Sequence, residues 1–156
     1  MDGKAKIEEY LRENGVPYEL THHPLAFTAQ DVASSEHIPG QMVAKVVMVA
    51  ADEKMVMLVL PAPQHVDLKK AATLVGAKSV RLAREAEFSG LFPGCDVGAE
   101  PPFGNLFGVP AYVDESLTRD ETIVFRAGTH TDTISMKFAD YERLAKPSRA
   151  DFAEQH

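Results

Sequence analysis

The residues best suited to chemistry lie in a loop rich in glycine and proline. This loop spans residues 93–105 and reads PGCDVGAEPPFGN. Proline lacks a backbone donor and glycine is free to adopt positive φ, so the stretch is neither a helix nor a central strand. Loops of this kind bring bare backbone N–H and C=O groups close to a ligand. A long structural connection is the alternative interpretation.

Two further stretches accompany this loop. Lys45 interrupts the apolar run MVAKVVMVAA of residues 42–51, and the turn Ala127–His130 follows a second predicted strand at 122–126. A lysine in such a strand either extends its stem to an edge, with its ammonium in water, or points into a partly desolvated cleft that binds an anion. The strand alone leaves both interpretations open.

Composition limits the classes of function. The chain has 156 residues, 45% of them hydrophobic, which predicts one domain over residues 1–146 and a polar tail over 147–156 that frays. A net charge of −7 disfavours broad binding to duplex nucleic acid, and the basic window 69–84 is either a phosphate-gripping patch or a solvated surface. No apolar run reaches the roughly 18 residues that span a bilayer, and the charged N-terminus is unlike a signal peptide, so we expect a cytoplasmic protein.

Cysteine and histidine usage predicts no metal and no cofactor. The single cysteine, Cys95, has no internal disulfide partner, and the six histidines lack paired metal-ligand spacing. Cys95 is a candidate nucleophile without an evident base beside it. A metal-dependent hydrolase that uses His22, His65 and His130 is another alternative.

The hydrophobic pattern predicts an α+β fold. Strands are expected at 42–51, 55–60, 80–82, 109–113, 122–126 and 133–136. Helices are expected at 3–14, from Thr28 to about Ile38, at 68–75, 84–91 and 138–145. Several connections are too short for parallel crossovers, so the sheet should be mixed and largely antiparallel.

The order of Lys45, the GAEPPFG loop at Gly98–Gly104 and the AGTH turn at Ala127–His130 resembles the YbaK/ProRS-associated editing-domain family. Its members are small aminoacyl-tRNA deacylases, either free-standing or inserted in prolyl-tRNA synthetases. The resemblance extends from about Ile7 to Leu144 and implies a partly closed sheet with surrounding helices. It also implies hydrolysis of the ester that joins a wrong amino acid to the 3′ acceptor end of a tRNA. Mischarged proline tRNA is the implied substrate, and prolyl-tRNA synthetase is a candidate partner.

The resemblance also implies site residues. Lys45 matches the family's essential lysine, and Gly98 and His130 match the two sides of its pocket, so we expect these three to be catalytic. The residues expected to bind substrate are Thr28, Pro101, Pro102, Phe103, Gly104, Gly128 and Thr129, with Pro101 and Phe103 walling a small side-chain pocket. Lys45 is followed by Val46, where many members carry a polar residue, so alanine, cysteine, serine and threonine all remain open as the amino acid removed.

The residues also permit this chemistry on their own terms. The chain shows no nucleophile elbow and no recognisable Ser-His-Asp order, which disfavours a covalent serine mechanism. Water or the neighbouring ribose hydroxyl can attack an activated ester when positioning and charge stabilisation supply the rate. Lys45 would bind the terminal phosphate or the ester carbonyl, the loop backbone would orient the carbonyl, water or α-amino group, and His130 would shape the pocket. The alternatives are a nucleotide- or tRNA-end-binding module without turnover and a hydrolase of free amino-acid esters.

Overall fold

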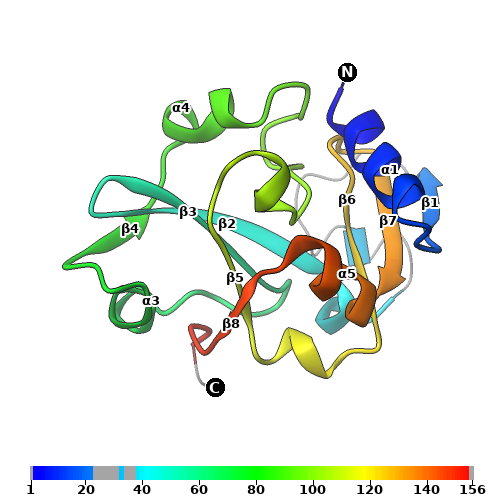
Figure 1. The fold of residues 1–156 in the computed structure, drawn as a ribbon. Helices are drawn as coiled ribbons and strands as arrows, with labels where there is room; N and C mark the ends of the chain where they lie inside the picture. The colour runs from blue at the N-terminus through cyan, green and yellow to red at the C-terminus, as the bar shows by residue number, and fades with distance from the viewer. Residues whose placement is uncertain (1, 23–31, 34–37, 155–156) are drawn as a thin grey trace.

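Two β-sheets form the centre of the fold, and helices pack around them (Figure 1). The computed structural model describes residues 2–22, 32–33 and 38–154. The first sheet is antiparallel, with the order β1 (Glu19–His22), β7 (Asp132–Lys137) and β6 (Thr122–Arg126). The second is mixed, with the order β4 (Val80–Leu82), β2 (Ala44–Ala51), β3 (Lys54–Pro61), β5 (Ala111–Asp114) and β8 (Ser148–Ala150).

The helical elements surround these sheets. The α-helices are α1 (Gly3–Glu13), α3 (Leu68–Val75), α4 (Glu85–Phe88) and α5 (Phe138–Ala145). Short 3-10 turns are η1 (Gly40–Met42), η2 (Ser89–Leu91), η3 (Gly104–Leu106) and η4 (Leu117–Arg119). None of the helices in the described part of the chain has the length and apolar character that a bilayer crossing requires.

The predicted α+β class is confirmed, but the sheet is divided. An isolated parallel bridge between Val43 and Val124 links the start of β2 to β6, and this bridge is where the two sheets meet. The strands separate after the bridge, so the mixed, largely antiparallel pairing that the sequence predicts is divided between two sheets. The helix expected from Thr28 lies mostly outside the described residues.

The β2–β3 hairpin is the longest paired segment and is confirmed as predicted. It pairs without interruption from Ala44 opposite Pro61 to Ala51 opposite Lys54. Asp52 and Glu53 form its turn with φ of 49° and 72°, the positive values that a two-residue hairpin turn requires. Most side chains on both faces of the hairpin are buried, which explains why nearly every position in it is apolar.

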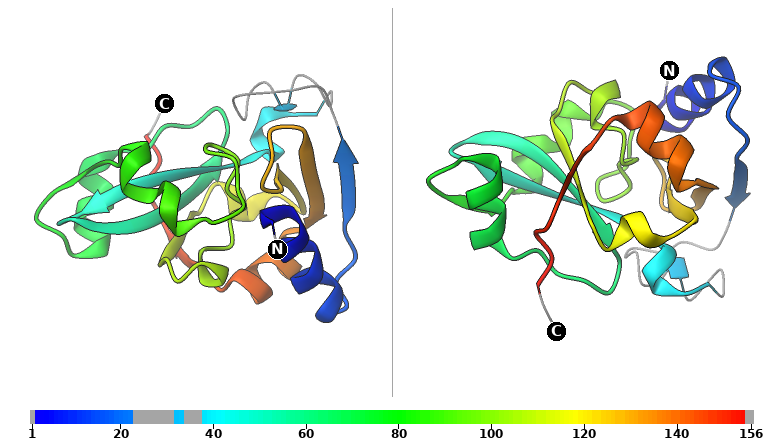
Figure 2. Two further views of the ribbon diagram at one scale, coloured as in Figure 1. Left: turned by 90° about the horizontal axis from the view of Figure 1, so that it is seen from above. Right: turned by 60° about the horizontal axis from the view of Figure 1, so that its bottom comes forward.

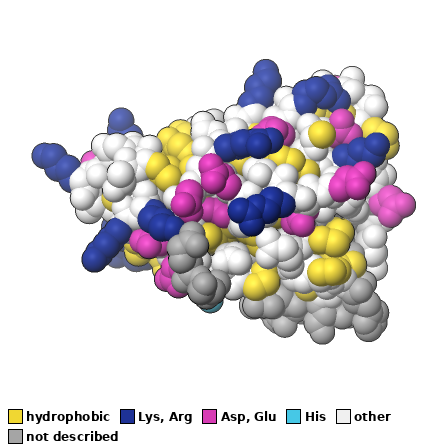
Figure 3. Space-filling view, turned by 90° about the horizontal axis from the view of Figure 1, so that it is seen from below, with side chains coloured by type: hydrophobic (Ala, Val, Ile, Leu, Met, Phe, Trp, Pro, Cys, Tyr) yellow, Lys and Arg dark blue, Asp and Glu magenta, His cyan; other side chains and the backbone are white. Residues whose placement is uncertain are grey.

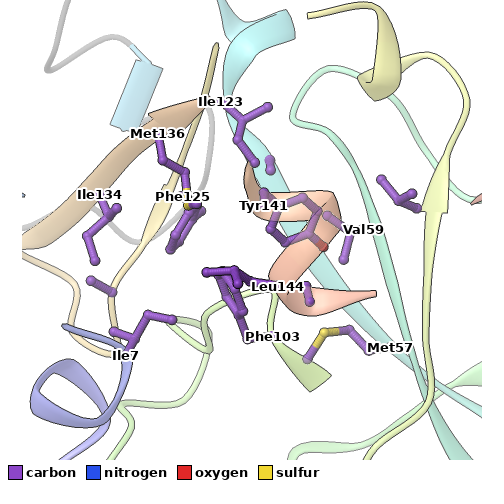
Figure 4. Packing of buried hydrophobic residues seen from close by; sticks show 14 of the residues in the cluster. Ile7, Met57, Val59, Phe103, Ile123, Phe125, Ile134, Met136, Tyr141 and Leu144 are labelled. Carbon is purple, nitrogen blue, oxygen red and sulfur yellow. The ribbon is translucent and has the colours of Figure 1, made fainter. Parts of the chain in front are cut away.

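Aromatic rings form the centre of the larger core (Figure 4). Phe103 is fully buried and meets the ring of Tyr141 edge-on at 5.2 Å and that of Phe125 at 5.6 Å. The buried Tyr141 hydroxyl donates to the carbonyl of Pro102 at 2.9 Å, so its polar tip is satisfied. These contacts attach the Pro-Pro segment to α5 and fix the far end of the glycine-rich loop.

Residues 147–154 of the C-terminal segment pack against the fold, so for these residues the prediction of fraying is wrong. β8 pairs in parallel with β5, and the ring of Phe152 is fully buried in the second core beneath α3. Asp114 stabilises this arrangement, because its carboxylate accepts hydrogen bonds from the backbone N–H groups of Phe152 and Ala153, each at 2.9 Å. The two described ends of the chain lie far apart, as both Figure 1 and Figure 2 show.

Asp114→Asn is expected to lower the free energy of unfolding by about 2 kcal/mol, because the amide oxygen accepts more weakly than a carboxylate and the amide nitrogen cannot accept from Ser116. Burial alone would raise the pKa of Asp114, but hydrogen bonds from Ser116, Phe152 and Ala153 outweigh it and leave the pKa below its ordinary value. The stabilisation is thus complete above about pH 4 and is lost as pH falls through the folded-state pKa. Denaturant titrations from pH 7 down to pH 3 should show a shallower acid dependence in the variant than in the wild type.

Asp151→Asn is the matched control for that measurement, because its side chain is 55% exposed and pairs only with Lys70 at 3.3 Å. We expect it to change stability by less than about 1 kcal/mol. Equal losses in Asp114→Asn and Asp151→Asn would show that the buried carboxylate does not hold the C-terminal segment.

Candidate functional site

The glycine-rich loop and the turn after β6 form one hydrogen-bonded unit, which we call the loop–turn unit (residues 96–100 and 126–132). The Asp96 N–H donates to the Gly128 carbonyl, and the Gly128 N–H donates to the Ala99 carbonyl, each at 2.9 Å. His130 Nε2 bonds to the carbonyl of Val97 at 2.8 Å. The structure thus brings together Gly98, Gly128, Thr129 and His130, as the sequence predicts.

Charged side chains bond both the backbone N–H and the backbone carbonyl of Gly98. Its N–H donates to the Glu100 carboxylate at 2.8 Å, and its carbonyl accepts from Arg126 Nη1 at 2.5 Å. Its φ of +87° favours glycine, and an added Cβ would lie 3.4 Å from the His130 ring. Because the N–H is already bonded to Glu100, it is not the free backbone donor that the sequence led us to expect.

The two side chains that bond Gly98 are ionisable and buried. Glu100 is 7% exposed and Arg126 is 9% exposed. Burial raises the pKa of Glu100, and the backbone hydrogen bonds and the nearby Arg126 and His130 oppose that rise. The bonds from Gly98 to Glu100 and from Arg126 to Gly98 therefore hold the loop through side chains that are themselves buried.

His130 chiefly holds the glycine-rich loop against the turn. A carbonyl only accepts, so the bond to Val97 requires that Nε2 carries the proton and donates. The Nδ1 atom is shielded from solvent. The geometry therefore favours His130 as a residue that holds the loop against the turn over a general base acting through Nε2.

Asp132 anchors the turn. Its carboxylate accepts from the Thr129 hydroxyl at 2.6 Å and lies 3.1 Å from His22 Nδ1 and 3.6 Å from Lys4 Nζ. Burial would raise the pKa of Asp132, but these partners lower it overall. The Thr129 hydroxyl is thus engaged inside the protein, and the turn is linked to α1.

Lys45 lies in a surface pocket of about 330 Å³ at the start of β2. Its half-buried side chain shares the pocket with apolar residues and loses hydration, which lowers its pKa. In the described part of the chain no carboxylate forms an ion pair with it. A partly desolvated, unpaired ammonium gains more from an anionic ligand than a fully hydrated one.

Strand register relates Lys45 to the loop–turn unit. Val43 and Val124 are bridge partners, so their side chains share a face. Lys45 and Arg126 each follow two residues later, and side chains two apart on a strand point the same way. Lys45 lies in the five-stranded sheet and Arg126 in the three-stranded sheet, and each side chain points away from the core that holds its neighbour, Ala44 or Phe125.

Other predicted residues lie on the core side. Phe103 packs entirely within the core, so the structure does not place it in a pocket wall as expected. Gly104 is buried. A Cβ at this position would overlap the carbonyl oxygen of Val109, so no larger residue fits there. Pro101 and Pro102 are also buried, and Thr28 lies outside the described residues.

Sequence reasoning missed Arg126, Glu100 and Asp132. A signal existed for Arg126, because it ends the apolar strand TIVFR immediately before the Ala127–His130 turn, much as Lys45 interrupts β2. The predicted basic window is largely paired, since Arg81 bonds Glu87 at 2.7 Å. That pairing favours a solvated surface for this part of the window.

The histidines of the metal-dependent alternative make separate contacts. His22 bonds Asp132, His130 bonds Val97, and His65 lines the pocket beside Lys45. Within residues 2–22, 32–33 and 38–154, no cluster of three or more metal-ligating side chains occurs.

Cys95 is expected to be unreactive near neutral pH. Burial, with Glu100 and Asp96 nearby, raises its pKa to about 11, so little thiolate is present. Alkylation at pH 7.5 should be about 100-fold slower than for a free cysteine, whose pKa is about 8.5. Cys95→Ala should retain the wild-type rate of any ester hydrolysis. A loss of activity in that variant would instead indicate a nucleophilic thiol.

Comparison with known proteins places this geometry in a family. The sequence matches the aminoacyl-tRNA editing domain over residues 23–144. It is 36% identical over 98 residues to the multifunctional Ser/Thr-tRNA deacylase ProXp-y of Escherichia coli strain K12. That match covers 62% of this chain and 58% of the relative, so the chain matches somewhat more than half of the relative's length.

Solved structures show the same fold. A crystal structure described as a candidate trans-editing enzyme for prolyl tRNA synthetase superposes with a TM-score of 0.85 at 22% identity, covering 99% of each chain. A hypothetical protein of known structure gives a TM-score of 0.86 at 21% identity, covering 96% of this chain and 99% of that one. The family match spans more than half of the chain and includes both Lys45 and the loop–turn unit. The chain therefore belongs to the aminoacyl-tRNA editing domain family.

Proposed function

We propose that this protein hydrolyses the ester of a misacylated tRNA, with proline tRNA carrying a small wrong amino acid as the substrate. The observation that carries the proposal is the half-buried ammonium of Lys45, which forms no ion pair among the described residues, on a strand that meets β6 at the Val43–Val124 bridge just before the loop–turn unit. Membership of the editing-domain family supports the reaction type, and the curated relative's name, Ser/Thr-tRNA deacylase, supports serine and threonine as first candidates.

In this proposal Lys45 stabilises negative charge as it develops on the ester carbonyl oxygen, or holds the terminal phosphate. A preorganised positive charge in a partly desolvated site stabilises a developing oxyanion more than water does. Arg126 and Glu100 act indirectly by fixing the Gly98 peptide. Water supplies the attacking oxygen, the bond between the carbonyl carbon and the ribose oxygen breaks, and the ribose oxygen takes up a proton, so the products are the free amino acid and the uncharged tRNA.

The surface suits brief contact with the end of a tRNA. The chain carries a net charge of −7, and on the face shown in Figure 3 the acidic and basic side chains of the described residues are interspersed. Such a surface favours contact with the single-stranded acceptor end over wrapping of the duplex. Prolyl-tRNA synthetase is a candidate partner that would deliver the substrate.

A panel of proline tRNAs charged with alanine, cysteine, serine or threonine tests this function. We expect the purified protein to release at least one of these amino acids well above the spontaneous rate, and correctly charged prolyl-tRNA to persist. If uncharged tRNA binds but no ester of the panel is hydrolysed, the protein is a binding module. If free amino-acid esters are hydrolysed as fast as their tRNA-linked counterparts, the substrate is a small molecule.

A further inference from the structure

The pocket beside Lys45 has an apolar wall that ester hydrolysis alone does not explain. Its apolar members are Val47, Val66, Leu68 and Leu82, and its polar members are Lys45, His65 and Glu154. Leu82 is 58% exposed, more than the other exposed large hydrophobic side chains of the described residues. We call this pocket the Leu82 groove.

The apolar wall follows from strand register. Leu82 of β4 lies opposite Val49 of β2, and Val47 and Lys45 precede Val49 at alternate positions, so these side chains share one face. Helix α3 covers this face through its Leu68 side and leaves the part nearest Lys45 open. The groove thus begins at the ammonium of Lys45 and continues along β2 toward Leu82.

A neighbouring pocket extends the groove along the start of α3. It shares Val66, Leu68 and Glu154 with the groove and adds Asp67 and Lys69. Lys69 is exposed, and among the described residues no carboxylate forms an ion pair with it, whereas the adjacent Lys70 pairs with Asp151. A second cation without an ion pair among the described residues therefore lies one pocket beyond Lys45.

This arrangement matches a nucleotide more closely than other ligands. A base offers a flat apolar face to the leucine and valine side chains and a polar edge to His65 and Glu154, and the phosphate complements the lysines. A volume of about 330 Å³ falls at the small end of the range for ligand pockets. A lone phosphate would gain nothing from the apolar wall, and a purely aliphatic ligand would leave the charged groups unsatisfied.

Resting on the function proposed above, we propose that the Leu82 groove binds a nucleobase of the unpaired 3′ end of the tRNA. The base lies on Leu82 and Val47, the backbone phosphates approach Lys45 and Lys69, and the ester points toward Arg126 and the loop–turn unit. The groove thereby recognises RNA in a sequence-tolerant way and sets the register of the ester.

The test uses an uncharged RNA hairpin with a four-nucleotide unpaired 3′ end and does not depend on catalysis. Leu82→Asp places a negative charge on the exposed wall, and we expect it to raise the Kd for this RNA by about 10-fold, the scale of one lost stacking contact. Leu91→Asp is the matched control, because Leu91 is 38% exposed and does not line the groove, and its Kd should equal the wild-type value. Thermal denaturation of both variants shows whether folding is preserved.

Methyl NMR of the wild-type protein gives a second readout that needs no variant. Adding the hairpin should shift the methyl signals of Val47, Leu68 and Leu82 and leave those of Leu20 and Leu91 in place. The groove assignment is overturned if the wild type does not bind the hairpin, if those methyls do not shift, or if Leu82→Asp binds with the wild-type Kd. Binding with these shifts but without hydrolysis of any charged tRNA would contradict the proposed function and leave the groove in place.

Discussion

Lys45→Ala is expected to lower kcat/KM for a misacylated tRNA by about 100-fold or more, the usual cost of removing one preorganised charge-stabilising group. The ammonium is half-buried and unpaired among the described residues, so its removal takes away the positive charge and leaves no buried partner behind. Steady-state deacylation measured by release of the free amino acid gives kcat and KM separately. A loss in kcat indicates a role at the ester carbonyl, and a rise in KM alone indicates a phosphate contact.

Two variants control that measurement. Lys54→Ala removes an exposed lysine at the other end of the same hairpin and should leave kcat/KM and the melting temperature unchanged. Lys45→Arg retains the charge but changes its shape, so it should recover part of the activity if charge is what matters. Wild-type kcat/KM in Lys45→Ala would remove this lysine from the mechanism.

Gly128→Ala is expected to cost about 3 kcal/mol of stability, from a strained backbone and a steric overlap together. Gly128 has φ of +89°, and an added Cβ would lie 2.9 Å from the Lys4 backbone nitrogen and 3.0 Å from the Gly3 carbonyl carbon. At about 2–4 °C per kcal/mol for a chain of this size, thermal denaturation should show a fall of about 6–12 °C. Deacylation should fall as well, because Gly128 bonds the loop at Asp96 and Ala99.

Gly76→Ala separates the two contributions. Gly76 ends α3 with φ of +72°, but an added Cβ there meets no atom within 4 Å. It should therefore cost only the backbone strain, about 1 kcal/mol. Equal losses at both positions would show that the close approach of α1 to the turn does not restrict residue 128.

Local patterns predicted most of the elements. The alternating and continuous apolar runs gave the β2–β3 hairpin, and helix α5 has the predicted bounds, because such elements depend on neighbours in sequence. The two sheets meet at an isolated bridge between Val43 and Val124, which are 81 residues apart by number. No local pattern reveals such a contact.

The C-terminal segment and the glycine-rich loop also depend on contacts between residues far apart in the sequence. The polar composition of residues 147–156 indicated fraying, but the single ring of Phe152 and the carboxylate of Asp114 hold the segment in place. Phe103 was expected to wall the pocket because it belongs to the Gly98–Gly104 loop, and it instead packs against Tyr141. In both cases a long-range packing contact decided the outcome.

The sequence predicted the glycines of the site but not the side chain that bonds them. Gly98 and Gly128 both adopt positive φ, which glycine allows more readily than other residues. The role of Arg126 depends on its bond to a carbonyl 28 positions earlier in the sequence, which only the folded chain creates.

The most direct measurement is the single-turnover release of serine from serine-charged proline tRNA, with wild-type protein and Lys45→Ala in parallel. We predict first-order release by the wild type at least about 100-fold faster than by the variant. Release at the spontaneous rate with both proteins, for serine and for the other amino acids of the panel, would contradict an ester-hydrolysing role for this chain.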